Sequence, residues 1–507
     1  MTKRFLVALL MVAAPADLKV RTTSAPATSV VQAFRPAVAF AQAQHAECSH
    51  LTMLRFPDVK IAEVTAVPAA TTGVIRAPHC RVNGVIGTEI KFTLLLPDEW
   101  NHKFFMGGGG GFVGSIQNSA SATVNQGYAT VGTDTGHTGG GVDAKWALNN
   151  IERRVNFGYL AVHRTADVAK AIVSSYYGAA STKSYFTGCS RGGGQAVMEA
   201  LRYPDDFDGV IAGAPAMDWT GIGAQFIKDA QAAYPTSTTP LFTPEVLKSV
   251  SAQILAACDA LDGVKDGVME DPRRCKVDVG ALTGLTDAQK TALKKIYAET
   301  RAKDGSVLYP GQPFGGEGEL QGWPAWISGG ALPGNSLQYG FGTELFKYFI
   351  FNDPSWDYSK YDFASFKRDT ELTASYLNSN DPNLDAFKSK GHKLIMWHGW
   401  ADAGLSPLGT VQYYDQVQAR DPKAQDFFRL FMLPGVLHCG GGSGPDNVDW
   451  NAAAVDWVEK GAAPTRLVAR KMAAAGPTMS RPVCPYPQHA VYSGNGSFDD
   501  EKNFVCK

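Results

Sequence analysis

The sequence predicts an α/β fold in which helices cover both faces of a mostly parallel sheet. Three observations support this prediction. Short apolar runs alternate with helical patterns in the first part of the chain, the alternation stops near residue 219, and it returns near residue 391. Alternating strands and helices favour parallel pairing, because a crossover helix returns the chain to the edge of the sheet where it started. We therefore expect one core that is interrupted by a long insertion.

The expected elements follow in chain order. Each expected strand is short, apolar and bounded by glycine, proline or polar turn residues. The apolar runs before the insertion cover residues 90–97, 103–106, 128–134, 184–187 and 210–215, and those after it cover 393–399 and 427–432. Apolar residues at helical spacing over 159–177 and again over about 192–202 predict the two helices that flank the fourth strand.

Four segments are expected along the chain. Residues 1–43 form an export signal and leader, 44–218 the first part of the core, 219–390 an inserted domain, and 391–507 the second part of the core. Two basic residues, Lys3 and Arg4, precede an apolar run that is typical of an export signal. That run is too short to span a membrane, and no later segment has the required length. The sequence predicts a secreted or periplasmic protein and leaves the cleavage site open.

Composition narrows the class of partner. Hydrophobic residues make up 45% of the 507 residues, and the formal net charge is -1. This composition is that of a globular protein with a core. Because no block of Lys and Arg stands out, nucleic acid is not an expected partner. A small-molecule substrate is expected instead, and the sequence does not specify an oligomeric state.

Eight cysteines follow the export signal, which predicts disulfides in an oxidising compartment. Eight cysteines allow 105 pairings, so the assignment rests on locality and on neighbouring residues. Locality pairs Cys48 with Cys80, Cys258 with Cys275 and Cys484 with Cys506, and this leaves Cys189 for Cys439.

Ser190 is the expected nucleophile. It lies in a G-x-S-x-G pattern between an expected strand and an expected helix, which is typical of a nucleophile elbow. Gly188 and Gly192 supply the small residues that a tight turn requires. A chance match in a glycine-rich chain is the alternative, and the strand–turn–helix context favours the elbow.

Asp402 and His438 are the expected acid and base. Each follows a strand, and the chain order of serine, acid and histidine is that of α/β-hydrolases. The sequence thus predicts an α/β-hydrolase core with a large inserted domain. Asp446 and Asp449 are rival acids, but they come after the histidine. His398 is a rival base, and we interpret it as a packed structural histidine beside two tryptophans.

Two cysteines stand directly beside the expected catalytic pair. Cys189 precedes Ser190, and Cys439 follows His438. A disulfide between them would tie the nucleophile to its base through their neighbours. The oxyanion hole needs main-chain N–H groups, one just after the nucleophile and one from an earlier loop. Arg191 supplies the first by position, and Gly110 or Gly111 in the glycine run is expected to supply the second.

An Asp-rich loop, residues 259–268, forms a second constellation. Asp259, Asp262 and Asp266 come at short spacing and are separated by Asp-Gly turns, which suits a hard cation with oxygen ligands. Carbonyls of Val264 and Val268 are candidates to complete the set. The pattern is not that of an EF-hand, and a pair of ordinary turns is the alternative.

At these residues the chain resembles the tannase and feruloyl esterase family. The resemblance rests on residues 188–193, Asp402, His438-Cys439 and the Asp-rich loop, with further likeness at 133–137 and 156–159. It covers most of the chain from about Cys48 onward. It implies hydrolysis of esters of aromatic acids, a lid in the insertion, and a structural Ca²⁺ in that lid. The implied ligands are Asp259, Asp262, Val264, Asp266 and Val268.

The expected function is a secreted serine esterase of the feruloyl esterase type that works through an acyl-enzyme. A tannase or a mono(2-hydroxyethyl) terephthalate hydrolase is the alternative, because that branch shares the motifs. A non-catalytic ligand-binding module or a peptidase on the same fold is more remote. Trp323, Trp326 and Phe341 in the insertion are candidates to bind an aromatic acyl group, and lid core is the other interpretation of these aromatics.

Overall fold

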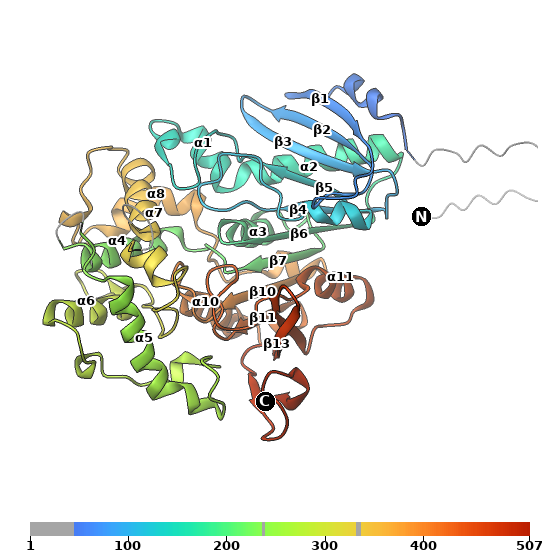
Figure 1. Cartoon of the computed structure of the whole chain (residues 1–507). Coiled ribbons are helices and arrows are strands. Elements are labelled where there is room, and N and C mark those ends of the chain that lie inside the picture. Colours follow the sequence, from blue (N-terminus) through green and yellow to red (C-terminus); the bar gives the residue numbers. More distant parts are fainter. Residues whose placement is uncertain (1–44, 236–238, 331–335) are drawn as a thin grey trace, which may run out of the picture. The chain divides into compact units, whose positions relative to one another are not determined.

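A nine-stranded sheet organises the part of the chain that this computed structural model describes, residues 45–235, 239–330 and 336–507 (Figure 1). The strand order is β1-β2-β3-β5-β4-β6-β7-β10-β11. From β5 to β11 all neighbours pair parallel, whereas β1, β2, β3 and β5 pair antiparallel in succession. The mostly parallel sheet is confirmed. The expected export signal and leader, residues 1–43, lie outside the described residues.

Seven of the nine strands coincide with the apolar runs of the sequence. The strands are β1 Val59–Val67, β2 His79–Ile86, β3 Ile90–Pro97, β4 Lys103–Gly107, β5 Ala129–Thr133, β6 Lys183–Cys189, β7 Gly209–Gly213, β10 Lys393–Gly399 and β11 Phe428–Leu433. Every residue of β5 and β7 is buried, which explains why neither strand carries a charged residue. The edge strand β1 is largely exposed and carries Lys60 and Glu63, so it lacks the apolar run that reveals a buried strand.

Helices cover both faces of the sheet, as the alternation of side chains along each strand requires. Phe104 and Met106 of β4 pack in one apolar cluster with residues of α2 (Ala161–Tyr177), α3 (Arg191–Arg202) and α10 (Pro407–Arg420). Phe105, between them, points to the opposite face and packs in a second cluster with residues of α11 (Trp450–Lys460). The core is therefore a sheet between two helical layers.

The long segment between β7 and β10 is mainly helical. It contains α4 Trp219–Ala233, α5 Pro244–Cys258, α6 Asp287–Tyr297, α7 Leu337–Glu344, α8 Phe366–Leu377 and α9 Asp385–Ser389, with a short ribbon of β8 Thr300–Arg301 and β9 Val307–Tyr309. In Figure 1 the helices α4 to α8 lie together beside the end of the sheet. Phe112 and Phe157 of the core share an apolar cluster with residues of α4, so the insertion packs directly on the core.

The C-terminal region adds two small antiparallel ribbons that the sequence analysis did not predict. β12 Leu467–Ala473 pairs with β13 Gly476–Val483, and β14 Ala490–Tyr492 pairs with β15 Phe504–Cys506.

All four predicted disulfides are present, Cys48–Cys80, Cys189–Cys439, Cys258–Cys275 and Cys484–Cys506. Among the described residues, no helix has both the length and the apolar character that crossing a membrane demands.

Candidate active site

Ser190 occupies a strained turn between β6 and α3. Its backbone has φ 62° and ψ -121°, a conformation that a residue with a side chain rarely adopts. The turn is tight because a Cβ atom at Gly188 would lie 2.5 Å from the main-chain carbon of Gly192. The Ser190 main chain is held from both sides, since its N–H donates to Gly213 at 2.9 Å and its carbonyl accepts from Ala216 at 3.0 Å. This is the geometry of a nucleophile elbow.

Asp402 and His438 come together from the loops that follow two adjacent parallel strands, β10 and β11. The Nδ1 atom of His438 lies 2.7 Å from Oδ2 of Asp402. The Asp402 side chain is fully buried, and the His438 side chain is 10% exposed. The other oxygen of Asp402, Oδ1, accepts from the N–H groups of Gly404 at 2.7 Å and Leu405 at 2.9 Å. The carboxylate is thus fixed on both oxygens.

His398 contributes a second imidazole to the same carboxylate. Its Nε2 lies 2.9 Å from Oδ2 of Asp402, and its Nδ1 lies 2.7 Å from the Thr410 hydroxyl. The expectation of a buried histidine holds, but the sequence analysis missed its contact with the acid. The spacing of four residues between His398 and Asp402 across the turn after β10 does not by itself mark this contact.

Two nearby imidazoles determine the charge state of Asp402. Burial by itself would raise the pKa of this carboxyl group. His438 and His398 outweigh burial through their charge and their hydrogen bonds, and they hold the pKa of Asp402 well below its ordinary value. Asp402 is therefore ionised over the neutral pH range, as an acid that orients a catalytic imidazole must be.

The Cys189–Cys439 disulfide links the serine turn to the histidine loop, with 5.9 Å between the two Cα atoms. Within the described part of the chain, no hydrogen bond joins the Ser190 hydroxyl to His438; such bonds are often long in unliganded enzymes. The two rival acids have other contacts. Asp446 accepts from the N–H of Gly441, and Asp449 caps the start of α11.

The glycine run at residues 107–111 packs against the start of α3. A Cβ atom at Gly192 would lie 3.2 Å from the carbonyl oxygen of Gly109, so only glycine permits this approach without a shift. The N–H of Gly110 already donates to the Gln117 side chain at 2.8 Å. The N–H groups of Gly111 and Arg191 donate no hydrogen bond to any residue that the structure describes.

The Arg191 side chain points into the protein. It is 1% exposed, and its Nη2 donates to the carbonyls of Phe157 and Gly158. The guanidinium also lies over the Phe157 ring, 4.4 Å from the ring centroid. Burial lowers the pKa of Arg191 to about 9. The side chain therefore anchors the start of α3 to residues 156–160.

One of the three expected aromatic residues lies against the histidine, and a second stacks on the first. The Trp326 ring meets His438 edge-on with 4.7 Å between centroids, and Phe341 stacks on Trp326 at 6.1 Å. Trp323 is different, since it is 1% exposed and packs beside Tyr297 inside the insertion. The structure does not bring Trp323 to the site. On this short helical segment Trp323 faces the interior of the insertion, whereas Trp326 faces the α/β core.

The Asp-rich loop adjoins the turn that precedes His438. Asp262 accepts from the N–H groups of Val264 and Glu270, both at 3.0 Å, and Asp259 accepts from Gly267. Asp266 forms an ion pair with Arg481. A Cβ atom at Gly435 would lie 3.2 Å from the Val268 side chain, so the loop touches the turn after β11.

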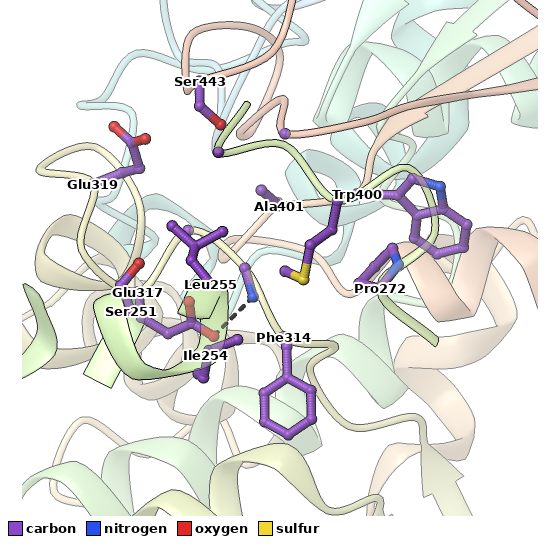
Figure 2. A pocket seen from close by; sticks show the side chains of 15 residues that line it. Ser251, Ile254, Leu255, Pro272, Phe314, Glu317, Glu319, Trp400, Ala401 and Ser443 are labelled. Atoms are coloured by element: carbon purple, nitrogen blue, oxygen red, sulfur yellow. Dashed lines mark hydrogen bonds between the residues drawn. The ribbon is translucent and has the colours of Figure 1, made fainter. Parts of the chain in front are cut away.

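A small cavity of about 40 Å³ lies between α5 and the loops after β10 and β11 (Figure 2). Its lining includes Ala401, next to the catalytic-acid candidate, and Met269 from the region of the Asp-rich loop. The buried Glu317 beside it accepts hydrogen bonds from Gly315 at 2.7 Å and from the Tyr297 hydroxyl at 2.9 Å. The cavity is too small for an ester substrate, and it marks where the insertion supports the Asp402 loop.

Comparison with known proteins identifies the family of the chain. The family model described as tannase and feruloyl esterase matches residues 72–507. The chain belongs to the tannase and feruloyl esterase family. It is 32% identical to the mono(2-hydroxyethyl) terephthalate hydrolase of Piscinibacter sakaiensis over 87% of each chain. It is also 32% identical to feruloyl esterase B of Aspergillus niger, over 89% of this chain and 90% of the relative.

A solved structure gives the same result for the fold. Feruloyl esterase B from Aspergillus oryzae superposes with a TM-score of 0.82 at 27% identity, covering 91% of this chain and 99% of that one. The α/β-hydrolase-like fold and the family resemblance predicted from the motifs are confirmed. The protein is a carboxylic ester hydrolase, and its function is that of an esterase of the feruloyl esterase type.

Proposed function

We propose that this protein hydrolyses esters of aromatic carboxylic acids through an acyl-enzyme formed on Ser190, with His438 as base and Asp402 as the orienting acid. One observation carries the proposal: a strained serine turn is joined by a disulfide to the loop of a histidine that is bound to a buried carboxylate. Serine requires such a base, because its hydroxyl is a weak nucleophile at its free pKa.

The geometry supports a two-step mechanism. The Ser190 oxygen attacks the ester carbonyl while His438 accepts the hydroxyl proton at Nε2, and this proton then passes to the departing alcohol. Water attacks the resulting acyl-enzyme with the same imidazole as base, which releases the acid and returns a proton to Ser190. Asp402 remains ionised and stabilises the imidazolium formed in each step.

The main-chain N–H groups of Arg191 and Gly111 are the oxyanion donors that we favour, since both lack an acceptor among the described residues. Gly110 would serve only if Gln117 released its N–H. The aromatic acyl group is assigned to Trp326, whose ring lies edge-on to His438, and to Phe341, which stacks on Trp326. Aromatic rings bind one another in such stacked and edge-on geometries.

The proposal extends to the domains and the location of the protein. Residues 219–390 act as a lid over the core halves 44–218 and 391–507, and residues 1–43 direct export. Packing of α4 with Phe112 and Phe157 supports a lid that closes on the core. Four disulfides support a secreted or periplasmic location, where such bonds persist.

A structural Ca²⁺ belongs to the same proposal. The donors of the Asp-rich loop suit this ion, since carboxylate and carbonyl oxygens are its preferred ligands. The carboxylates of Asp259, Asp262 and Asp266 do not all lie within 4.8 Å of one another in the described residues, and Asp266 pairs with Arg481, so the ion would have to draw them together. Asp259, Asp262 and Asp266 would bind through carboxylates and Val264 and Val268 through carbonyls. The ion neutralises this loop and so stabilises the turn before His438.

The test is a substrate panel of methyl ferulate, methyl gallate, mono(2-hydroxyethyl) terephthalate and a peptide amide. We expect turnover of aromatic esters and none of the amide. Ser190→Ala and His438→Ala should each lower kcat on the order of 10⁴-fold or more, and the double variant should be little worse, because the triad acts as a unit. Substantial turnover by folded Ser190→Ala would refute the nucleophile assignment.

A further inference from the structure

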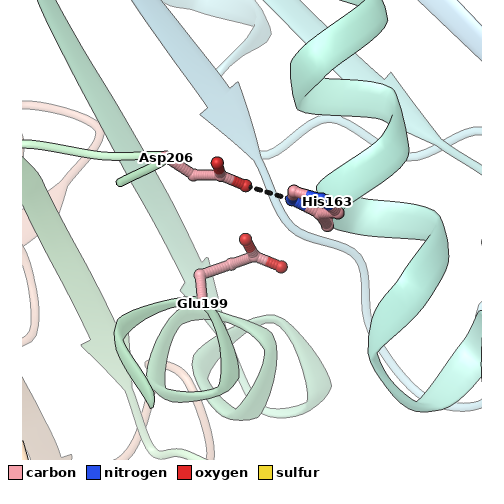
Figure 3. Close-up of side chains that lie close together, drawn as sticks. All are labelled: His163, Glu199 and Asp206. Atoms are coloured by element: carbon pink, nitrogen blue, oxygen red, sulfur yellow. Dashed lines mark hydrogen bonds and ion pairs between the residues drawn. The ribbon is translucent and has the colours of Figure 1, made fainter. Parts of the chain in front are cut away.

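Three side chains far from the ester site converge between the two helices on one face of the sheet. His163 lies on α2, Glu199 lies near the end of α3, and Asp206 lies in the turn before β7. One ligand atom from each lies within 4.8 Å of the others. Figure 3 shows the three side chains pointing toward one another. Because Ser190 stands at the opposite end of α3, this cluster takes no part in the ester chemistry.

Glu199 is the residue that demands an explanation. It is 1% exposed, and no N–H or hydroxyl donor among the described residues reaches either carboxylate oxygen; only the carboxyl group of Asp206 is close enough to share a proton with it. Its carboxylate points toward the space beside the His163–Asp206 pair (Figure 3). A buried carboxyl group either keeps its proton or, when ionised, pairs with a cationic side chain or a metal ion. Burial, and after it the charge of Asp206, raise the pKa of Glu199 well above its ordinary value.

His163 has the second contact that metal-bound imidazoles require. Its Nδ1 lies 2.7 Å from Oδ2 of Asp206, and its Nε2 lies 3.5 Å from Oδ2 of Asp167. A carboxylate hydrogen-bonded to the nitrogen away from the metal fixes the tautomer and raises the basicity of a ligating histidine, and Asp167 lies close to that position without a hydrogen bond in this structure. The ring is also held flat against Tyr203, with 3.7 Å between centroids. The imidazole is therefore oriented before any ion binds.

Charge and access also suit a divalent ion. Two carboxylates and a neutral imidazole balance a charge of two, while the nearby charges of Lys170 and Asp167 are opposite in sign and offset each other. A metal would take the place of the proton between His163 and Asp206. Lys170 donates to the main-chain carbonyl of Asp206, which leaves the carboxylate free for an ion. The His163 side chain is 25% exposed and the Asp167 side chain 61%, so the site opens to solvent through α2.

We propose that His163 Nδ1, Glu199 and Asp206 bind one divalent transition-metal ion of the zinc class, with water completing a tetrahedral site. One nitrogen and two carboxylate oxygens are a set that zinc accepts, whereas calcium prefers six or more oxygen ligands. The ion joins α2 to α3 and the turn before β7. Its role is structural, and it is independent of the proposed ester hydrolysis and of the Asp-rich loop.

The experiment uses the full chain, stripped with a chelator and returned to buffer that contains excess calcium, so that the Asp-rich loop is satisfied throughout. Zn²⁺ is titrated by calorimetry, and Co²⁺ is added as a spectroscopic probe of tetrahedral coordination. We expect one equivalent of Zn²⁺, a visible Co²⁺ spectrum and a higher Tm with Zn²⁺. Glu199→Gln, which keeps the volume and removes the charge, should weaken binding by at least about 10-fold and abolish the spectrum.

Asp167→Asn is the graded variant, since it alters only the residue behind His163. It should weaken Zn²⁺ binding by about 10-fold while the Co²⁺ spectrum remains tetrahedral. Equal binding by wild type and folded Glu199→Gln would overturn the proposal. Absence of any Co²⁺ spectrum in wild type would also overturn it and would leave a proton shared between Glu199 and Asp206 as the explanation of the cluster.

Discussion

His398 and His438 bind the same carboxylate oxygen, Oδ2 of Asp402, at 2.9 Å and 2.7 Å. The second oxygen is held by two main-chain N–H groups. The acid thus has four hydrogen-bond donors, and only one of them belongs to the proposed base. This arrangement makes His398 a positioning residue, because it acts on the reaction through Asp402 and the His438 ring.

The first prediction concerns His398→Leu, which keeps similar volume and removes one donor to Asp402. We expect kcat to fall about 10- to 100-fold with KM little changed, since a small displacement of the acid misaligns the base. The pKa of Asp402 should rise as one cause of its depression is lost, but it starts so far below the ordinary value that the group stays ionised near neutral pH. Steady-state kinetics at neutral pH separate the effect on kcat from the effect on KM.

Thr410→Val is the matched control, because Thr410 contacts only the far nitrogen of His398. It should change kcat by less than the His398 variant does. Full kcat at neutral pH in folded His398→Leu would contradict the positioning role.

Two tryptophans three residues apart give the second prediction. Trp326→Ala should raise KM for aromatic esters by about 10-fold or more while Tm changes little, because its ring faces His438 and stacks on Phe341. Trp323→Ala should instead lower the free energy of unfolding by about 3–5 kcal/mol, since it empties a buried site. The measurements are KM and thermal unfolding for both variants. Equal effects of the two substitutions on KM would contradict the assignment of Trp326 to substrate binding and of Trp323 to the core of the insertion.

The contrast between these tryptophans shows what the sequence alone supplies. Buried parallel strands and the Gly188–Gly192 pattern are local signals, and the order of serine, acid and histidine follows from the topology. The direction in which the Trp323 and Trp326 side chains point depends on how the insertion packs on the core, and no local sequence pattern predicts that packing. The donor from His398 to Asp402 was missed for a similar reason, because a buried histidine beside aromatic residues has the same sequence signature whether or not it contacts a carboxylate.

The third prediction concerns the bridge that spans 250 residues between Cys189 and Cys439. Replacing both cysteines by serine should lower kcat about 10-fold or more at a temperature where the variant is folded, because the serine turn and histidine loop lose their direct link. Stability should also fall, by up to roughly 5 kcal/mol on a chain-entropy estimate. Replacing Cys48 and Cys80 is the control, and it should affect Tm without affecting kcat. Full activity in the first variant would contradict a positioning role for the bridge.

The fourth prediction concerns the Asp-rich loop. Calcium removal should lower Tm, since an ion bound only by the folded state stabilises it by about 3 kcal/mol at a free concentration 100-fold above Kd. Asp262→Asn should lower Tm and abolish its response to added Ca²⁺, whereas Asp278→Asn, an exposed cap in the same region, should keep that response. Elemental analysis that finds no calcium in protein purified in its presence would contradict this site.

The last prediction concerns the pH dependence of stability that arises from Asp134. This carboxyl group follows β5, is 2% exposed, and accepts the N–H groups of Lys91 and Gly136 on one oxygen, both at 2.9 Å. Burial raises the pKa of Asp134 to about 6, and the two hydrogen bonds only partly oppose the shift. The folded state therefore holds the proton more tightly than the unfolded chain does. The stability from this group is complete below the unfolded pKa, near 4, and is lost as pH rises through about 6.

Asp134→Asn keeps the accepting oxygen and removes the charge, so it abolishes this pH dependence. Relative to wild type, the variant should gain roughly 1–2 kcal/mol in free energy of unfolding between pH 4 and pH 7, after allowance for solvent screening. The difference between the two proteins at several pH values is the measurement, because any constant cost of the buried amide cancels in the slope. If the difference in Tm between wild type and Asp134→Asn stays constant from pH 4 to pH 7, the Asp134 carboxyl group is not protonated preferentially in the folded state.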